Sequence, residues 1–556
     1  VLLLAAGALL RPTPAAGARQ QIAAAFVGLR TLGVDAGETE KLERAVQRRL
    51  SDDPHYRPVS HDDPALTARC KADLDCYCRA TRGKNLPRVL YGNVGRIEDN
   101  YTIELILVDT QNCSIDNSVF VTEQLGAAGA GDRLGELTQK LLKPRDSISN
   151  TAAKAERDVD AVPAVVTVFS DKQMQQLGIT RLDELFRLVP GFELVDTNFG
   201  DVPLHHGLSE TLLYMVDGVP LSNPKFNFTV LGQHFAMALN DVERIEFVRG
   251  PGSVLWGQNA FLGIVNFITR EPSGERERIR AHLRLGTLNT QEFHASIGGN
   301  HRWLSYYLGT TYIRSEGPST RVNNPLIAEL GVAAPIWGAG SVSTDNEADT
   351  YADVTAKVRL AQRLEVLFRY MSAMNYFEIS PFGSPLPADD RGWWDLADFL
   401  YAASWEDALP FGLRYRLSAS RYEHRSWENF VVHPSSTTLP FGFSSLQGNE
   451  HQPEVNHLVE GRLEHNLERH WLSNRALVGL SYLHQQMPNQ YATFTTGQAE
   501  GEEALDIREN TVQTVSAYFQ DDLALLQGRL LVSGGLRYDS HDPFQSALSS
   551  QGALIG

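Results

Sequence analysis

Residues 242–270 read VERIEFVRGPGSVLWGQNAFLGIVNFITR. Residues 244–248 alternate in polarity, as expected for a strand with one buried face, and Gly250-Pro251-Gly252 breaks the pattern. Gly250 and Gly252 permit backbone conformations that a Cβ atom would forbid. A second strand is expected over residues 263–269, where Gly263 allows close packing on the neighbouring strand. The stretch therefore predicts two strands joined by a glycine-rich connection.

The residues upstream of this stretch predict the rest of a compact α/β unit. Residues 162–169 have the apolar character of a buried strand. Ser170 is suited to cap the helix that follows, with Gln173 at the capping-box position. A second helix is expected over residues 179–188, before Pro190-Gly191. Further along, Asp217-Gly218 lies between two short apolar runs and predicts a two-residue β-hairpin.

Three blocks of this unit carry a family resemblance. They read VTVFSDKQMQQLGITRLDELFRLVPGFEL, LLYMVDGVPL and VERIEFVRGPGSVLWGQNAFLGIVNFITR, in this order. Together they resemble the plug domain of TonB-dependent outer-membrane receptors over residues of about 160 to 272. The plug-motif residues are Asp217, Gly218, Arg244, Glu246, Arg249, Gly250, Pro251, Gly263 and Asn266.

Two charged motif residues, Glu246 and Arg249, are expected to face the polar inner wall of a barrel. A static ion pair between plug and wall is the preferred interpretation, and a gating latch is the alternative. His205-His206 stands where the family usually has an Arg-Gly step, but a metal site there would lack a third ligand, so no metal is expected. Residues 147–158 occupy the expected place of a TonB box without its valine-rich character.

From residue 275 onward the polarity alternates with a period of two. Residues 279–285, 352–360, 413–419 and 515–519 each place apolar side chains on one face and polar ones on the other. The connections alternate between short ones, near residues 299–301, 361–363, 410–411, 468–470 and 527–528, and long ones, over about 315–347, 377–392, 425–452 and 486–509. A soluble β-sandwich has no reason to collect its long loops at one end. The pattern therefore favours an antiparallel transmembrane β-barrel.

About eleven strands are expected between residues 275 and 540. The resemblance to TonB-dependent receptors implies a barrel of 22 strands with a plugged lumen. An odd number of strands would leave an open edge, which a hydrocarbon layer forbids. The sequence is therefore expected to contain about the first half of a barrel.

The N-terminal part predicts export and a separate domain. Residues 1–10 (VLLLAAGALL) and Ala16-Gly17-Ala18 resemble the end of a secretory signal. Residues 19–145 predict a small α/β domain that loosely resembles domains of periplasmic proteins. Its disulfide candidates, which could pair in any of three ways, are Cys70, Cys76, Cys78 and Cys113.

Composition excludes some functions. The chain of 556 residues has a formal net charge of −17, which argues against binding nucleic acid. Beyond its first ten residues it has no uninterrupted apolar run of about 18 residues, the length that a membrane-spanning helix needs. A mean hydropathy of −0.24 is compatible with strands that alternate in polarity.

The expected fold class is mainly β: a transmembrane antiparallel β-barrel, about half present, with an α/β plug and a small N-terminal α/β domain. The expected segments are a signal-peptide remnant, a periplasmic domain, a linker, the plug and the half-barrel, at residues 1–18, 19–145, 146–157, 158–273 and 274–556.

The resemblance implies an outer-membrane receptor that imports a scarce nutrient, such as an iron chelate or cobalamin, with energy coupled through TonB, ExbB and ExbD. Outer-membrane lipid and a small-molecule nutrient are the other expected partners. The alternative is a surface adhesin or signalling receptor whose N-terminal domain relays ligand occupancy to a periplasmic partner. No HExxH, GxSxG, Walker A or EF-hand motif was found, so neither enzymatic activity nor a cofactor is expected.

The ligand-contact candidates lie in the plug segment NPKFNFT. They are Asn223, Lys225, Phe226 and Phe228. Four aromatic residues of the barrel region, Tyr376, Phe382, Trp393 and Trp394, are expected to form a membrane-interface girdle, with ligand contact as the alternative.

Overall fold

The computed structural model describes most of the chain. The described residues are 22–53, 55–60, 66–70, 74–81, 86–98, 100–110, 113–125, 127–143, 148–154, 157–159, 162, 164–197, 200–208, 211–221, 237–250, 252–257, 260–271, 277–301, 303–317, 320–323, 341–344, 349–377, 392–433, 446–469, 472–488, 490–496, 499–507, 509–525 and 530–555. The chain divides into one unit up to Pro144 and a second unit from Arg145, with residues 273–275 assigned to the first.

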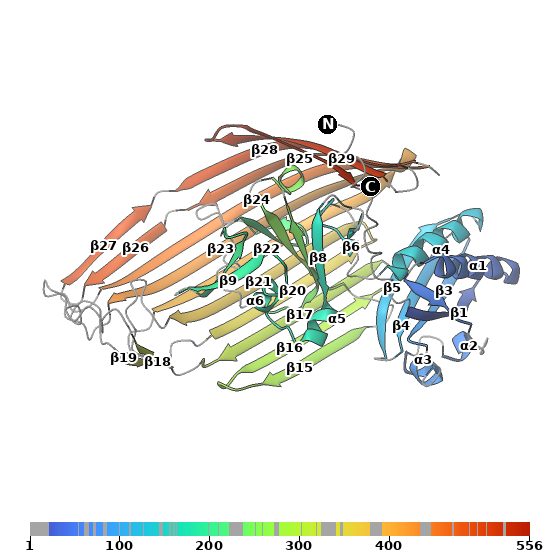
Figure 1. Cartoon of the computed structure of the whole chain (residues 1–556), viewed down its shortest axis with the longest axis horizontal. Helices are drawn as coiled ribbons and strands as arrows, with labels where there is room; N and C mark the ends of the chain where they lie inside the picture. The colour runs from blue at the N-terminus through green and yellow to red at the C-terminus, as the bar shows by residue number, and fades with distance from the viewer. Residues whose placement is uncertain are drawn as a thin grey trace, which may run out of the picture. The chain divides into compact units, whose positions relative to one another are not determined.

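The N-terminal unit is an α/β domain, as its pattern predicted. Its elements are β1 (Ile22–Leu32), α1 (Ala36–Asp52), β2 (Tyr56–Pro58), α2 (Leu66–Cys70), α3 (Leu74–Thr81), β3 (Arg88–Ile97), β4 (Asn100–Asp109), β5 (Ser114–Gln124) and α4 (Ala127–Leu142). The strands form one sheet in the order β2-β1-β3-β4-β5 (Figure 1). Strand β5 was not expected, because its polar start at Ser114 hides the period of two.

Two apolar cores hold this domain together, one on each face of the sheet. One face packs against α1 and α4 through residues such as Val46 and Leu134, and the other against α2 and α3 through Leu66 and Tyr77. The ring of Tyr77 stacks on that of Tyr91 at 4.1 Å between centroids. Within the described part of the chain, no helix is both long and apolar enough to span a membrane.

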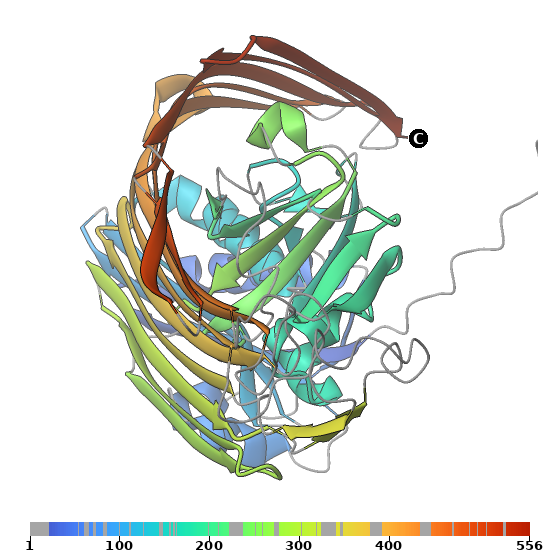
Figure 2. The same ribbon diagram turned by 90° about the vertical axis from the view of Figure 1, so that its left-hand side faces the viewer.

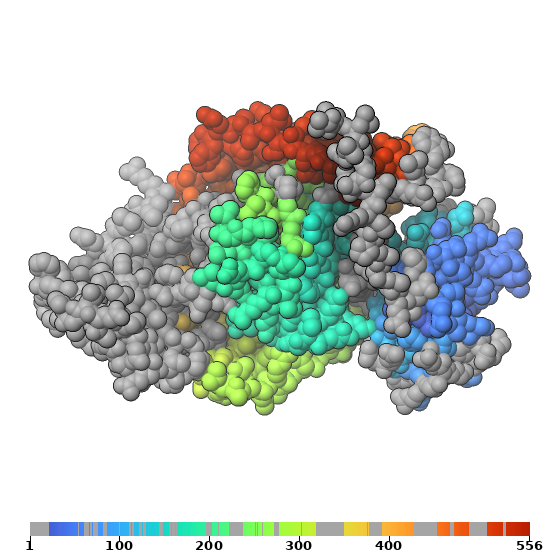
Figure 3. Space-filling view, in the orientation of Figure 1, coloured from blue at the N-terminus to red at the C-terminus, as the bar shows by residue number. Residues whose placement is uncertain are grey.

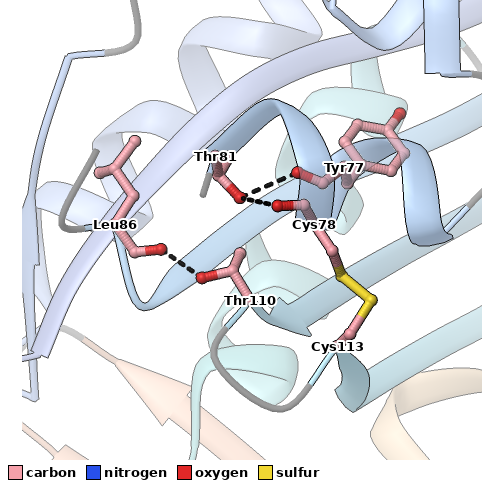
Figure 4. Close-up of a disulfide and its surroundings, with 6 residues drawn as sticks. All are labelled: Tyr77, Cys78, Thr81, Leu86, Thr110 and Cys113. Carbon is pink, nitrogen blue, oxygen red and sulfur yellow. Dashed lines mark hydrogen bonds between the residues drawn. A yellow bond between two sulfur atoms is a disulfide. The ribbon is translucent and has the colours of Figure 1, made fainter. Parts of the chain in front are cut away.

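The cysteines of this domain form two disulfides. Cys70 pairs with Cys76 and Cys78 pairs with Cys113, which selects one of the three connectivities that the sequence left open. The second disulfide ties α3 to the residue that precedes β5 (Figure 4). Beside it, the Thr81 hydroxyl donates to the Tyr77 carbonyl at 2.8 Å, which closes the last turn of α3.

The second unit begins with a small mixed sheet, which we call the plug. Its elements are β6 (Ile148–Ser149), β7 (Arg157–Asp158), β8 (Val165–Ser170), α5 (Asp171–Leu177), α6 (Leu182–Phe186), β9 (Phe192–Thr197), β10 (Gly200–His205), β11 (Leu212–Val216), β12 (Val219–Pro220), β13 (Val242–Arg249), α8 (Ser253–Trp256) and β14 (Gly263–Thr269). The central sheet has the order β12-β11-β14-β13-β8. The core of the plug includes Phe186, Ile245, Phe247, Val265 and Phe267.

Local signals in the plug sequence were correct. Ser170 caps α5, and its hydroxyl and the Gln173 side chain form the expected capping box. Asp217 and Gly218 both have positive φ, 47° and 79°, and join β11 to β12 as the expected hairpin. Helix α6 is shorter than the expected 179–188: it begins at Leu182, three residues later, and ends at Phe186, two residues earlier, where the chain turns at residues 187–189 ahead of Pro190.

A large antiparallel sheet, which we call the wall, curves around the plug (Figure 2). Its consecutive path is β15 (Arg278–Leu285), β16 (Gln291–Asn300), β17 (Leu304–Ser315), β20 (Asp349–Leu360), β21 (Leu364–Phe377), β22 (Gly392–Leu409), β23 (Leu413–His433), β24 (Leu446–Arg469), β25 (Leu472–Met487), β28 (Asn510–Leu525), β29 (Leu530–Asp542) and β30 (Ala547–Ile555). Among the described residues, β15 and β30 are the edges of this path and do not pair with each other.

The expected count of about eleven strands up to residue 540 is confirmed, because the path from β15 to β29 has eleven. A twelfth strand, β30, was not expected, because its sequence ALSSQGALI has little strand character, but it pairs with β29. One expectation about the wall was wrong. The long connections expected over residues 425–452 and 486–509 are mostly strand: β23 and β24 extend into the first, and β26 (Gln490–Thr496) and β27 (Ala499–Ile507) form a hairpin in the second. In these segments polar and apolar side chains do not alternate, so the sequence gives no strand signal. The backbone N–H and C=O groups nevertheless pair with those of the neighbouring strand.

The alternation of wall side chains is clearest on β28. Tyr518 is buried toward the plug, whereas Val515 and Phe519 are 57% and 46% exposed on the other face. A further strand pair, β18 (Thr320–Asn323) and β19 (Ser341–Thr344), follows β17. In the space-filling view, the teal and green surface of the plug lies between the first strands and the last strands of the wall (Figure 3).

Candidate functional site: the contacts between plug and wall

The residues that lead into the plug are held by hydrogen bonds. We call residues 149–154 the strap; the sequence predicted that these residues belong to a polar linker. The Glu246 carboxylate of β13 accepts hydrogen bonds from Ser149 Oγ at 2.7 Å, the Asn150 amide at 2.9 Å, and the Thr151 amide and hydroxyl at 3.0 and 2.6 Å. Ser149, Thr151 and Glu246 are fully buried. The strap is therefore fixed to a central strand of the plug.

The expectation that Glu246 and Arg249 form an ion pair with the wall was wrong. Glu246 binds the strap and also accepts from Arg244 Nε at 2.9 Å. Arg249 donates to the Pro190 carbonyl at 2.8 Å, inside the plug. The alternation along β13 shows which side chains share a face of the strand. It does not show which other element each of these faces contacts.

Further contacts tie the strap to both plug and wall. Trp256 Nε1 donates to the Thr151 carbonyl at 2.9 Å, and Asn266 Nδ2 donates to the Thr151 hydroxyl at 2.8 Å. From the wall, Arg475 of β25 donates to the Ala153 carbonyl at 2.9 Å. Asn266 was among the motif residues, so the structure gives it a role in holding the strap.

Lys154 makes the strap's direct ionic contact with the wall. Its ammonium group lies 2.5 Å from Glu460 Oε2 on β24 and 3.3 Å from the Tyr518 hydroxyl on β28. The Trp256 and Tyr518 rings lie 4.5 and 4.6 Å from the nitrogen, a cation–π arrangement. Burial lowers the pKa of Lys154 to about 8, although Glu460 opposes the shift. Sequence reasoning missed Lys154, because its partner lies 306 residues away.

We expect this shift to make the stability of the strap depend on pH. The pKa of Lys154 is lower in the folded clamp than the ordinary lysine value of about 10.4, so between pH 8 and 10 the folded chain binds fewer protons than the unfolded chain. Stability therefore rises with pH in this window. Lys154→Arg keeps its charge and should remove that rise, as measured by calorimetric unfolding at pH 7.5 and 9.5. An unchanged difference between the two pH values would refute the assignment.

A second ionic cluster joins the plug hairpin to the wall. Lys357 of β20 is buried, and its ammonium group lies 3.2 Å from Asp217 Oδ2, 3.3 Å from Glu271 Oε1 and 3.9 Å from Glu365 Oε2. Arg359 pairs with the same two glutamates. Asp217 also accepts from the Thr269 amide at 2.9 Å. The hairpin residue Asp217 therefore has a second role, which its turn signal did not reveal.

A family model described as TonB-dependent Receptor Plug Domain matches residues 158–264. The chain carries the plug domain of the TonB-dependent receptors. Its fold agrees with this family: an α/β plug against an antiparallel sheet that is similar to the barrels of solved receptors. The match covers the plug-motif residues read from the sequence, except Asn266, which lies beyond its end.

Curated relatives match over short regions. The vitamin B12 transporter BtuB of Photobacterium profundum is 28% identical over 128 residues, 22% of this chain and 21% of that protein. A pesticin receptor of Yersinia enterocolitica is 31% identical over 132 residues, 22% of this chain and 18% of that protein. The alignments span about a fifth of the length of these relatives.

Solved structures match over most of this chain. The siderophore receptor PiuA from Acinetobacter baumannii is similar with a TM-score of 0.53 and 14% identity, covering 72% of this chain and 62% of that one. FpvA from Pseudomonas aeruginosa PAO1 bound to pyoverdine gives a TM-score of 0.55 and 12% identity, covering 74% and 60%. At such identities the similarity is one of fold.

The predicted ligand-contact residues of the plug, Asn223, Lys225, Phe226 and Phe228, lie outside the described residues. Pro251 of the plug motif and Phe382 of the aromatic set do so as well. Trp393 and Trp394 lie at the start of β22 and pair with Tyr376 and Asn375 of β21. Trp394 is buried.

In the histidine pair of the plug, the His205 ring packs against an aromatic ring, while both of its nitrogens are buried without a hydrogen-bond partner among the described residues. His205 is buried and stacks on the Phe192 ring at 4.5 Å. Burial lowers its pKa, and His206 and Arg249 act in the same direction. No group of three or more metal-binding side chains occurs among the residues that the structure describes.

Proposed function

We propose that this TonB-dependent receptor resides in the outer membrane and imports a scarce small-molecule nutrient with energy coupled through TonB and its partners ExbB and ExbD. The supporting observation is the plug-domain match over residues 158–264, on a domain whose strap is clamped between plug and wall. Such a clamp connects any pull on the chain before residue 148 to a central strand of the plug. The N-terminal domain then lies in the periplasm.

The nutrient class is suggested by the relatives. The curated relative BtuB is named as a vitamin B12 transporter, and the solved neighbours include a siderophore receptor and a ferric citrate transporter. We therefore propose an iron chelate or a cobalamin as the nutrient. The proposed role is transport rather than catalysis, in keeping with the names of these relatives.

Outer-membrane lipid is the proposed surrounding of the wall. Large apolar side chains are exposed on the face of the wall that turns away from the plug, among them Leu283, Leu308, Leu417, Val459, Leu480, Val515 and Leu536. An outward apolar band is the feature that a membrane barrel requires.

Uptake measurements test this proposal. The complete gene product that contains this chain is produced in a strain lacking its own receptors, and cells are given ⁵⁷Co-labelled cyanocobalamin, ⁵⁵Fe-labelled ferric citrate or ⁵⁵Fe-labelled pyoverdine. We expect at least one probe to accumulate about tenfold above vector control, and a protonophore to abolish accumulation while surface binding at 4 °C persists. Accumulation that survives the protonophore, or the absence of accumulation of every probe, would contradict energised import of these nutrients.

A signalling role is the second candidate, and the separate N-terminal unit favours it. The described part of residues 22–143 has its own two cores and its own disulfides, so it forms a structural module distinct from the plug. Deleting this module separates the two functions. If uptake survives and a ligand-induced transcriptional response disappears, the module relays occupancy; if uptake disappears instead, the module serves transport.

A further inference from the structure

Asp241, the residue before β13, packs its carboxylate against Gly309 of the wall. A Cβ atom added to Gly309 of β17 would lie 2.1 Å from Asp241 Oδ1 and 2.7 Å from Oδ2, so only glycine admits the carboxylate. The Tyr307 hydroxyl donates to Oδ1 at 2.6 Å. Asp241 is completely buried. The carboxylate of this plug residue is therefore buried against the wall at Gly309 and Tyr307.

The strand register places a second carboxylate beside it. Gly309 pairs with Thr355 of β20, and Thr311, two residues further along, pairs with Asp353. Side chains at such positions on neighbouring strands are within reach of one another, and Asp241 and Asp353 do interact electrostatically. Asp353 is 1% exposed, and its Oδ2 accepts from the Tyr351 hydroxyl at 2.9 Å.

Two polar atoms of this cluster lack partners. Asp241 Oδ2 and Asp353 Oδ1 are buried and have no hydrogen-bond partner within bonding distance among the described residues, and the Thr355 hydroxyl is the neighbouring group that interacts with the Asp241 carboxylate. Buried polar atoms in folded proteins nearly always have a partner, so these two carboxylate oxygens indicate a bound species that supplies a donor or positive charge. Thr355 itself is fully buried.

The charges around the pair show what is missing. Arg369 of β21 approaches Asp353 Oδ2 at 3.4 Å, but Arg270 of the plug is already paired with Asp171 at 2.6 Å. His294 of β16 lies 3.8 Å from Asp241 Oδ1, beyond hydrogen-bond distance. The His282 ring of β15 lies 5.2 Å from the His294 ring, tilted by 34°, and its Nε2 atom lies 3.1 Å from Glu292 Oε1. Asp241 and Asp353 together carry two negative charges when both are ionised. The Arg369 guanidinium group supplies one positive charge, because Arg270 is paired with Asp171, so one negative charge is left to be neutralised.

We propose that Asp241 and Asp353 hold one bound proton between them, so that the contact of plug and wall at Gly309 is a proton-binding site. A single proton removes the surplus charge and turns one carboxyl into a donor for the unpartnered oxygens. A divalent cation would overcompensate the charge and lie near the positive Arg369. The inference does not depend on which nutrient is carried.

The site makes the docking of the plug sensitive to pH. Burial raises the pKa of Asp241 above its ordinary value. The docked state therefore binds more protons than the released state, and docking weakens as pH rises above the ordinary aspartate pKa of about 3.9. One proton of difference changes the opening equilibrium up to about tenfold per pH unit.

Hydrogen exchange of peptides covering residues 237–244 tests the proposal, measured in detergent micelles from pH 5 to 8 and corrected for intrinsic exchange. We expect the opening equilibrium of wild type to rise steeply with pH. Asp353→Asn and Asp241→Asn should each flatten this dependence, and the double variant should add nothing further. Asp539→Asn, which alters a buried carboxylate on β29 of the wall that is bound by Arg537, is the matched control and should keep the wild-type slope.

Three outcomes would overturn the proposal. The first is a slope that Asp353→Asn leaves intact. The second is a slope that disappears only in His294→Gln, which would assign the proton to the histidine. The third is a slope that changes when sodium replaces potassium, or when a chelator is added at constant ionic strength, which would make a metal ion the bound species.

Discussion

Replacing Glu246 by alanine should release the strap from the plug. The carboxylate accepts four hydrogen bonds shorter than 3.1 Å from Ser149, Asn150 and Thr151, all inside a buried site. Its loss leaves those donors and the Arg244 guanidinium without their acceptor. Removing one partner of a buried charged network costs about 3–5 kcal/mol. Exchange of the amides of residues 149–154 should therefore accelerate by roughly 10²- to 10³-fold, measured by hydrogen exchange with mass spectrometry.

Glu193→Ala provides the matched control for this experiment. Glu193 lies on β9 of the same domain and is exposed, so its loss removes an equal charge without touching the strap. Strap exchange in this variant should equal that of wild type. Equal strap exchange in Glu246→Ala and wild type would show that the clamp does not depend on the carboxylate.

Elements specified by neighbouring residues were predictable from the sequence. The capping box at Ser170 and Gln173 and the hairpin at Asp217-Gly218 involve residues within a few positions of one another, so each carries its own signal. The strands of the wall were found in the same way, because period-two alternation separates the side chains that are exposed from those that face the plug.

The site itself depends on contacts that no local pattern records. Lys154 meets Glu460 and Lys357 meets Asp217 only because the chain folds back over more than a hundred residues. Glu246 was correctly singled out, but alternation could not tell whether its buried side met the wall or the strap. Likewise, β30 is held by its ladder with β29 and not by its side chains, so a strand rich in serine and glycine escaped detection.

Replacing Lys357 by methionine should loosen the plug hairpin from the wall. The ammonium group is buried among Asp217, Glu271 and Glu365, and methionine fills similar volume without the charge. Asp217 then keeps its bonds to Thr269 but loses its cation, which leaves a buried carboxylate uncompensated at a cost of about 3–5 kcal/mol. Amides of residues 212–217 should exchange roughly 10²- to 10³-fold faster than in wild type, measured by hydrogen exchange with mass spectrometry.

A double-mutant cycle with Asp217→Asn shows whether this effect arises from the ion pair. If the two groups act together, the double variant Asp217→Asn/Lys357→Met should be less perturbed than the sum of the single variants, because neither charge is left alone. Lys140→Met, which removes an exposed lysine from α4 of the N-terminal domain, controls for the change in net charge. Additive effects of Asp217→Asn and Lys357→Met would mean that the ion pair does not hold the hairpin, because coupled charges must deviate from additivity.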